Sequence, residues 1–206
     1  MSPLEIIGVV VSALAIWLTA RRKMLCWPIG LASVALYGWI FFDARLYSDA
    51  LLQGAFAALQ LYGWQRWLVQ QRRGEGEGQE GTRPVVPVGG VRFARLAPDL
   101  IVAVGMSALL GAAMARFTDA ALPWIDASLA AFSLVAQLWT ARRYIASWTL
   151  WIVVDAVYVG VFIYKGLYLT SGLYALFLVL AALGRRDWSR ADAGRETSYV
   201  ASGGRV

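Results

Sequence analysis

The sequence contains no histidine and only one cysteine, Cys26, among its 206 residues. Without histidine it lacks the commonest metal ligand and the usual proton carrier near neutral pH. A single cysteine excludes an internal disulfide framework and a cysteine-based metal cluster. These absences disfavour metalloenzymes and hydrolases that use a histidine-containing triad. We therefore expect neither a metal nor a cofactor.

Charged residues are also scarce. They make up 16% of the chain, against about 25% in ordinary soluble domains. Hydrophobic residues reach 59%, and the mean hydropathy is +0.57. The ten tryptophans and nine tyrosines suit a protein with aromatic belts at two membrane surfaces. The composition therefore predicts an all-α membrane protein.

Seven apolar segments have the length of transmembrane helices, for which a bilayer core requires about 20 residues. They span roughly residues 4–20, 27–43, 47–68, 97–116, 124–141, 148–164 and 168–184. A signal peptide has basic residues before its apolar run, but here Glu5 precedes the first run and Arg21-Arg22-Lys23 follow it. We therefore expect an uncleaved first helix and seven transmembrane helices.

An internal repeat relates the two halves of the chain. A shift of 121 residues places Ser12–Trp67 on Ser133–Trp188 and aligns Thr19-Ala20-Arg21-Arg22 with Thr140-Ala141-Arg142-Arg143. A three-helix unit ends on the opposite side of the membrane, and one further helix returns the chain to the first side. The prediction is therefore a 3+1+3 arrangement of parallel repeats. Residues 1–69 and 118–188 form the repeats, and residues 97–117 form the linker helix.

The basic residues predict the orientation in the membrane. Seven crossings place only Arg45, Arg116 and Lys165 on the side of the N-terminus, whereas the other Lys and Arg residues fall on the opposite side. The positive-inside rule then predicts an N-terminus outside and a C-terminus in the cytoplasm. This asymmetry explains the net charge of +6 without a nucleic-acid partner.

Two segments have the composition of polar, unstructured chain. Residues 70–96 begin QQRRGEGEGQEGTRPVV and are rich in Gly, Glu and Pro, which predicts a flexible cytoplasmic linker. Residues 189–206 contain much Ala, Gly, Ser and Arg. For these we expect a disordered cytoplasmic tail.

Asp155 is the strongest candidate for a functional residue. It is the one carboxylate well inside an apolar run, and a charge at membrane depth is costly unless it faces protein or water. Trp151 and Tyr158 share its helical face at steps of three or four residues. Aromatic faces beside an acid favour flat or cationic rings. The structural alternative is an acid that accepts hydrogen bonds from a neighbouring helix.

Further candidates lie on the second and third segments. Gln53 and Gln60 are seven residues apart on one face, with Trp64 nearby, and Tyr37 is the counterpart of Tyr158 in the repeat. Glutamine both donates and accepts hydrogen bonds, which suits amide or sugar recognition. The alternative is helix–helix hydrogen bonding, which contributes about 0.6 kcal/mol in membranes. Trp67 and Trp188, near segment ends, fit interfacial belts.

Several motifs together resemble the PnuC family of nicotinamide riboside transporters. In the first half these are WPIG at 27–30, DARLYSDALLQ at 43–53 and YGWQRW at 62–67. In the second half they are WTLWIVVDAVY at 148–158 and YKGLYLTSGLY at 164–174. The resemblance covers all seven predicted helices but neither the linker at 70–96 nor the tail.

The resemblance implies a fold related to SWEET sugar transporters, homotrimers, and facilitated diffusion of nicotinamide riboside across the inner membrane. Phosphorylation in the cytoplasm would trap the substrate. By this reading Trp151, Asp155, Tyr158 and Gln53 contact the ribose and nicotinamide, with Gln60, Tyr37 and Trp64 as further substrate-binding candidates. Similar proteins carry thiamine or riboflavin, so these remain alternative substrates. An intramembrane enzyme that uses Asp155 is a third reading, and a non-transporting scaffold is a fourth.

Overall fold

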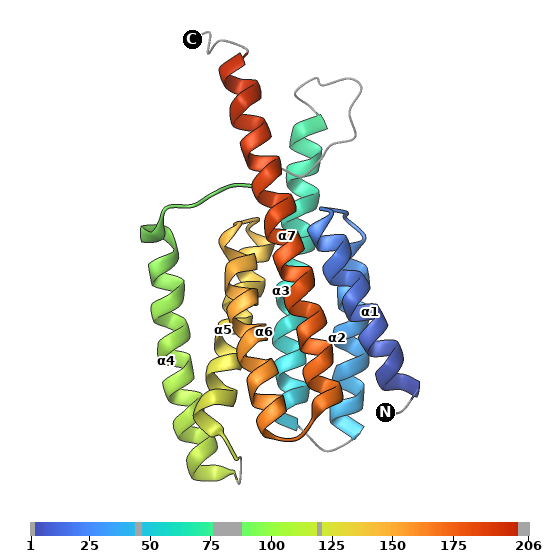
Figure 1. The fold of residues 1–206 in the computed structure, drawn as a ribbon, viewed down its shortest axis with the longest axis vertical. Coiled ribbons are helices and arrows are strands. Elements are labelled where there is room, and N and C mark those ends of the chain that lie inside the picture. Colours follow the sequence, from blue (N-terminus) through green and yellow to red (C-terminus); the bar gives the residue numbers. More distant parts are fainter. Residues whose placement is uncertain (1–2, 44–46, 76–87, 119–120, 202–206) are drawn as a thin grey trace.

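Seven helices make up the protein in a computed structural model that describes residues 3–43, 47–75, 88–118 and 121–201. They run alternately up and down the long axis, so the two termini lie at opposite ends (Figure 1). Their bounds are α1 Pro3–Ala20, α2 Cys26–Asp43, α3 Tyr47–Glu75, α4 Phe93–Phe117, α5 Pro123–Ala141, α6 Ala146–Tyr164 and α7 Tyr168–Ala201. The fold class is all-α, as the composition predicts.

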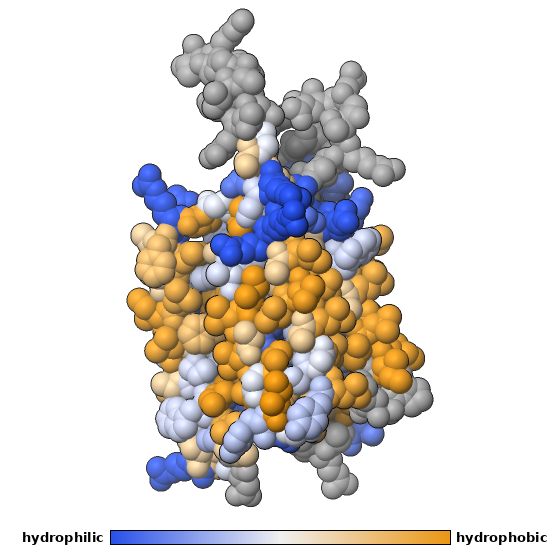
Figure 2. Space-filling view, in the orientation of Figure 1, coloured by the Kyte–Doolittle hydropathy of each residue, from blue (hydrophilic) through white to orange (hydrophobic). Residues whose placement is uncertain are grey.

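Four of these helices, α2, α4, α6 and α7, are long and apolar enough to cross a membrane. The apolar part of α1, Ile6–Ala20, is shorter. Several polar residues lower the apolar character of α3 and α5. In α5 this polarity accompanies burial, because nine of its residues are buried against neighbouring helices. Apolar side chains cover the middle of the molecule, and hydrophilic ones gather toward its ends (Figure 2).

Six helices pack as a closed ring. In order around the ring, each helix contacts the next: α1, α2, α3, α5, α6 and α7, and α7 returns to α1. The remaining helix, α4, packs against α5. In this order α2 and α6 occupy opposite positions. Asp155 on α6 is buried within this packing of helices.

A cluster of four tryptophans fills the end of the ring that lies toward the C-terminus. The Trp27 ring meets Trp67 edge-on at 5.1 Å between centroids, and Trp148 meets Trp188 edge-on at 5.4 Å. Trp67 and Trp188 lie 6.3 Å apart and join the two pairs. All four side chains are almost completely buried. The belt position expected for Trp67 and Trp188 is therefore wrong, since they are core residues.

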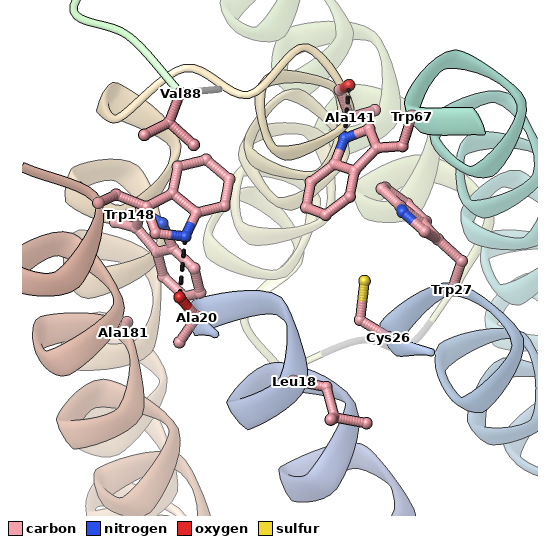
Figure 3. Close-up of a cluster of buried hydrophobic side chains, with 10 residues drawn as sticks. Leu18, Ala20, Cys26, Trp27, Trp67, Val88, Ala141, Trp148 and Ala181 are labelled. Atoms are coloured by element: carbon pink, nitrogen blue, oxygen red, sulfur yellow. Dashed lines mark hydrogen bonds between the residues drawn. The ribbon is translucent and has the colours of Figure 1, made fainter. Parts of the chain in front are cut away.

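Two indole hydrogen bonds fasten this tryptophan cluster to the ends of distant helices. The Nε1 of Trp67 donates to the carbonyl of Ala141 at 3.2 Å, and the Nε1 of Trp188 donates to that of Ala20 at 3.1 Å (Figure 3). These carbonyls belong to the last residues of α5 and α1. At a helix end, no later N–H of the same helix donates to such a carbonyl. The bonds join α3 to α5 and α7 to α1.

The turns after α1 and α5 share an unusual backbone conformation. Arg22 and Arg143 have φ angles of 55° and 64°, a left-handed conformation that few non-glycine residues adopt. Each follows a helix whose last carbonyl accepts a tryptophan bond. The two turns are therefore alike in backbone as well as in sequence.

The structure differs from the expected linker and tail. Gly89 lies beside the α5–α6 turn, where its N–H donates to the Arg143 carbonyl and its carbonyl accepts from the Ile145 N–H. The Gly90 N–H donates to the carboxylate of Asp192 at 3.1 Å. This end of the linker is therefore fixed, and α7 continues as a helix through Ala201 instead of ending before residue 189. Residues 76–87 and 202–206 lie outside the described part.

Close packing on tryptophan gives a prediction for Gly63. A Cβ atom at Gly63 would overlap the buried ring of Trp27, whereas a Cβ at Gly54 on the same helix would meet nothing within 4 Å. We predict that Gly63→Ala lowers the free energy of unfolding by about 1–3 kcal/mol, as overpacking does. Gly54→Ala is the matched control. Thermal unfolding in detergent measures both, and equal stability of the two variants would contradict this packing.

Candidate binding site

Asp155 lies at the middle of α6 and is only 5% exposed. Among the described residues, no side-chain or backbone donor forms a hydrogen bond with its carboxyl group, and no cation pairs with it. Burial of such a group without a partner costs several kcal/mol. The structural alternative, an acid satisfied by donors of a neighbouring helix, is therefore not supported.

Asp99, a second partly buried acid, differs from Asp155 because its carboxylate accepts hydrogen bonds from other side chains. The Oδ2 of Asp99 on α4 accepts hydrogen bonds from the Trp139 Nε1 and the Arg142 guanidinium, each at 2.8 Å. These contacts attach α4 to α5. Asp99 thus has a structural role, whereas Asp155 has none of this kind.

Aromatic rings stack beside Asp155. Tyr158, one turn further along α6, lies 4.4 Å from the ring of Tyr174 on α7 and 5.8 Å from Phe162. Tyr174 is also 5.2 Å from Phe162. The carboxyl group of Asp155 interacts electrostatically with both tyrosine hydroxyls. These rings form an aromatic wall next to the unpartnered acid.

The opposite position of the ring contributes Tyr37 on α2. Its hydroxyl acts electrostatically on that of Tyr174, which also interacts with Asp155. The ring of Tyr37 lies 6.0 Å from Phe41 and packs over Gly8 on α1, where a Cβ atom would come within 3.1 Å of it. The interior thus places Tyr37 of α2 near Tyr174 of α7, whose ring in turn contacts Tyr158 of α6.

Trp151 and Trp64 lie between this interior and the tryptophan cluster. Both are partly buried and pack against the cluster, from α6 and α3 respectively. The Nε1 of Trp151 donates to the Thr140 hydroxyl at 3.3 Å. Trp151 also packs beside Tyr158 against the apolar residues that surround Val154. It therefore connects the aromatic wall to the closed end of the ring.

The two glutamines have different surroundings. The amide of Gln60 lies over Gly30, so closely that a Cβ there would overlap its Nε2. Gln53 instead lines an open groove of about 400 Å³ between α2 and α3, together with Val34 and Gly38. The structure therefore does not gather the two glutamines at one place.

Acids also lie at the end of the bundle opposite the tryptophan cluster. Asp126 near the start of α5 interacts with Asp49 at the start of α3, and the Lys165 ammonium lies 3.6 Å from the Asp126 carboxylate. Both acids act electrostatically on the Tyr158 hydroxyl. Negative charge therefore extends from this end toward Asp155.

Sequence reasoning missed several residues of this interior. Tyr174 and Asp126 interact with Tyr158, and the buried Ser133 hydroxyl hydrogen-bonds with it. Tyr174 was detectable, because a shift of 121 residues places it on Gln53. Ser133 and Asp126 carried no such signal. Among the described residues no group of histidine, cysteine or acidic side chains could hold a metal ion.

Comparisons with known proteins extend over almost the whole chain. The profile of the nicotinamide mononucleotide transporter family matches residues 2–190. The chain belongs to this family. It is therefore a multi-pass transporter of the inner membrane and not an enzyme. The match includes all the residues of the interior described above.

Individual relatives of this transporter agree with the family profile. It is 28% identical to the nicotinamide riboside transporter PnuC of Escherichia coli (strain K12), over 91% of this chain and 85% of that protein. It is also 28% identical to the riboflavin/roseoflavin transporter RibM of Streptomyces davaonensis, over 92% and 87% of the two chains. The crystal structure of the vitamin B3 transporter PnuC matches with a TM-score of 0.71 at 21% identity, over 91% of this chain and 81% of that one. This likeness shows the shared fold.

The contrast between the two acids predicts opposite effects on stability. Asp99→Asn removes the charge from two hydrogen bonds, and we expect the free energy of unfolding to fall by about 1–3 kcal/mol. Asp155→Asn removes an uncompensated charge, so stability is expected to stay equal or to rise. Thermal unfolding of the two variants in detergent tests this. A larger loss for Asp155→Asn would mean that its carboxylate is bonded within the protein.

Proposed function

We propose that this transporter carries nicotinamide riboside into the cell by facilitated diffusion, and that phosphorylation in the cytoplasm traps the substrate. The buried, unpartnered Asp155 carboxyl beside stacked aromatic rings carries the proposal. Such a site offers a stacking surface and an acceptor to a ligand with a flat ring. The family and the PnuC relative support the choice of substrate.

We propose seven substrate-binding residues, and the placement of those on α6 supports the choice. Trp151, Asp155 and Tyr158 bind the substrate from α6, and Tyr37 faces them from α2. Gln60 and Trp64 lie on α3 toward the tryptophan cluster, and Gln53, which lines the groove between α2 and α3, is retained as a candidate from the sequence alone. Together these are the seven substrate-binding residues that the sequence predicts.

We propose that the architecture is a 3+1+3 arrangement of parallel repeats. Residues 1–69 and 118–188 are the repeats, residues 97–117 are the linker helix, and 70–96 and 189–206 are cytoplasmic. The paired indole bonds, the paired left-handed arginines and the symmetric order of the six-helix ring support it. Equivalent helices also run in the same direction in Figure 1.

We propose that the end with the tryptophan cluster faces the cytoplasm. Arg21, Arg142 and most other basic residues lie at this end, which supports an N-terminus outside. A homotrimer is proposed on the resemblance to PnuC proteins. In addition, α4 exposes large apolar side chains such as Ile101 and Leu109, which suit lipid or a second copy.

The tryptophan cluster closes the cytoplasmic end in this conformation. Its two indole bonds link α3 to α5 and α7 to α1, which are the contacts between the two proposed repeats. Release of substrate into the cytoplasm requires these contacts to separate. The transport cycle therefore alternates between this closed state and one in which the tryptophan pairs move apart.

Riboflavin is a second candidate substrate because of the RibM relative, and thiamine is a third. The deciding experiment uses purified protein in liposomes, with radiolabelled nicotinamide riboside, thiamine or riboflavin outside. We predict saturable, gradient-driven entry of nicotinamide riboside, with no requirement for ATP or an ion gradient. Saturable entry of riboflavin or thiamine alone would assign another substrate. Binding of nicotinamide riboside without any entry would support a scaffold.

The rate at which a thiol reagent labels Cys26 measures how tightly the tryptophan cluster closes the cytoplasmic end. It is only 3% exposed and belongs to the same buried cluster. We predict that replacing both Trp67 and Trp188 by Phe, which removes the two indole donors, accelerates labelling of Cys26 by a membrane-permeant thiol reagent several-fold. Trp39→Phe, at a site that is 68% exposed, is the control. An unchanged labelling rate in the double variant would contradict the proposed closure.

A further inference from the structure

Among the described residues, acids dominate the electrostatics of the aromatic wall. The acidic side chains that act electrostatically on the Tyr158 hydroxyl are those of Asp126, Asp155 and Asp49. Lys165 pairs with Asp126 at 3.6 Å and so offsets part of the charge at the outer end. No cation among the described residues lies against Asp155. The interior therefore presents a negative field to any ligand that enters it.

Two kinds of ligand group could satisfy the Asp155 carboxyl group, and their electrostatics differ. Hydroxyl donors would fill its hydrogen-bonding capacity but leave a negative charge buried in the membrane, which stays costly. A cation would neutralise that charge. The faces of aromatic rings attract cations as well, and the rings of Tyr158 and Tyr174 lie only 4.4 Å apart beside the acid. Both features of the site thus favour a positive ring.

The equivalent position in the first half of the chain reinforces this point. A shift of 121 residues places Asp155 on Val34, and Val34 lines the open groove between α2 and α3. The acid is therefore present on one side of the ring of helices only. A ligand in the bundle interior therefore meets this carboxyl group from the α6 side.

We propose that Asp155 determines specificity for flat aromatic rings that carry a fixed positive charge. This inference rests on the proposed function and adds a selection rule to it. The pyridinium ring of nicotinamide riboside has such a charge, and so has the thiazolium ring of thiamine. The reduced form, 1,4-dihydronicotinamide riboside, has the same ribose and carboxamide but no charge. Riboflavin is likewise uncharged.

The test compares binding of the oxidised and reduced forms of nicotinamide riboside to the purified protein in detergent. Competition against radiolabelled nicotinamide riboside gives both affinities without a membrane potential. The wild-type protein is expected to bind the cation at least tenfold more tightly than the reduced form. In Asp155→Asn this ratio should fall to near one, with the affinity for the reduced form retained. Asp155→Glu, which keeps the charge, should preserve the preference.

Asp187→Asn is the matched control, because Asp187 is half-exposed and lies near Arg21 at the opposite end of the bundle. This change should leave the ratio unaltered. Equal affinity of the wild-type protein for both forms would overturn the inference. An equal loss of both affinities in Asp155→Asn would also overturn it, because Asp155 would then recognise hydroxyls or hold the structure. Failure to bind either form would instead refute the proposed substrate.

Discussion

The closed end of this transporter depends on two hydrogen bonds from indole to backbone. Trp67 and Trp188 each donate to the last carbonyl of a helix far away in the sequence. In a bilayer, polar backbone groups must find partners within the protein, and helix ends are where such groups remain free. The same bonds therefore satisfy α1 and α5 and hold the ring of six helices together at that end.

Three acids among the described residues differ in their partners. Asp99 accepts two hydrogen bonds and attaches α4, and Asp192 accepts from the Gly90 N–H near the start of α4. Asp155 is more deeply buried than Asp99 and yet has no donor among the described residues. A fold selected only for stability has no reason to keep it. Its position beside the closely packed rings of Tyr158 and Tyr174 supports its proposed role as a contact for substrate.

Much of the fold could be predicted from sequence. Seven apolar runs mark the helices, and an exact tetrapeptide match marks the two similar turns that follow α1 and α5. The burial of Asp155 followed from its isolation within such a run. The cross-helix partners could not be predicted, since packing sets helix rotation. Periodicity did not reveal that Gln60 lies over Gly30 or that Tyr174 faces Tyr158. The helical end of α7 was also missed, because the contact between Asp192 and Gly90 is distant in sequence.

The central claim is that the bundle interior, and not the groove between α2 and α3, holds the substrate against Asp155. A structure of the protein with nicotinamide riboside bound tests it most directly. We predict that the nicotinamide ring packs on Tyr158 and Tyr174, with its positive nitrogen as the group nearest to the Asp155 carboxylate. A ligand bound in the groove beside Gln53, or an interior ligand whose charged ring points away from Asp155, would contradict the account.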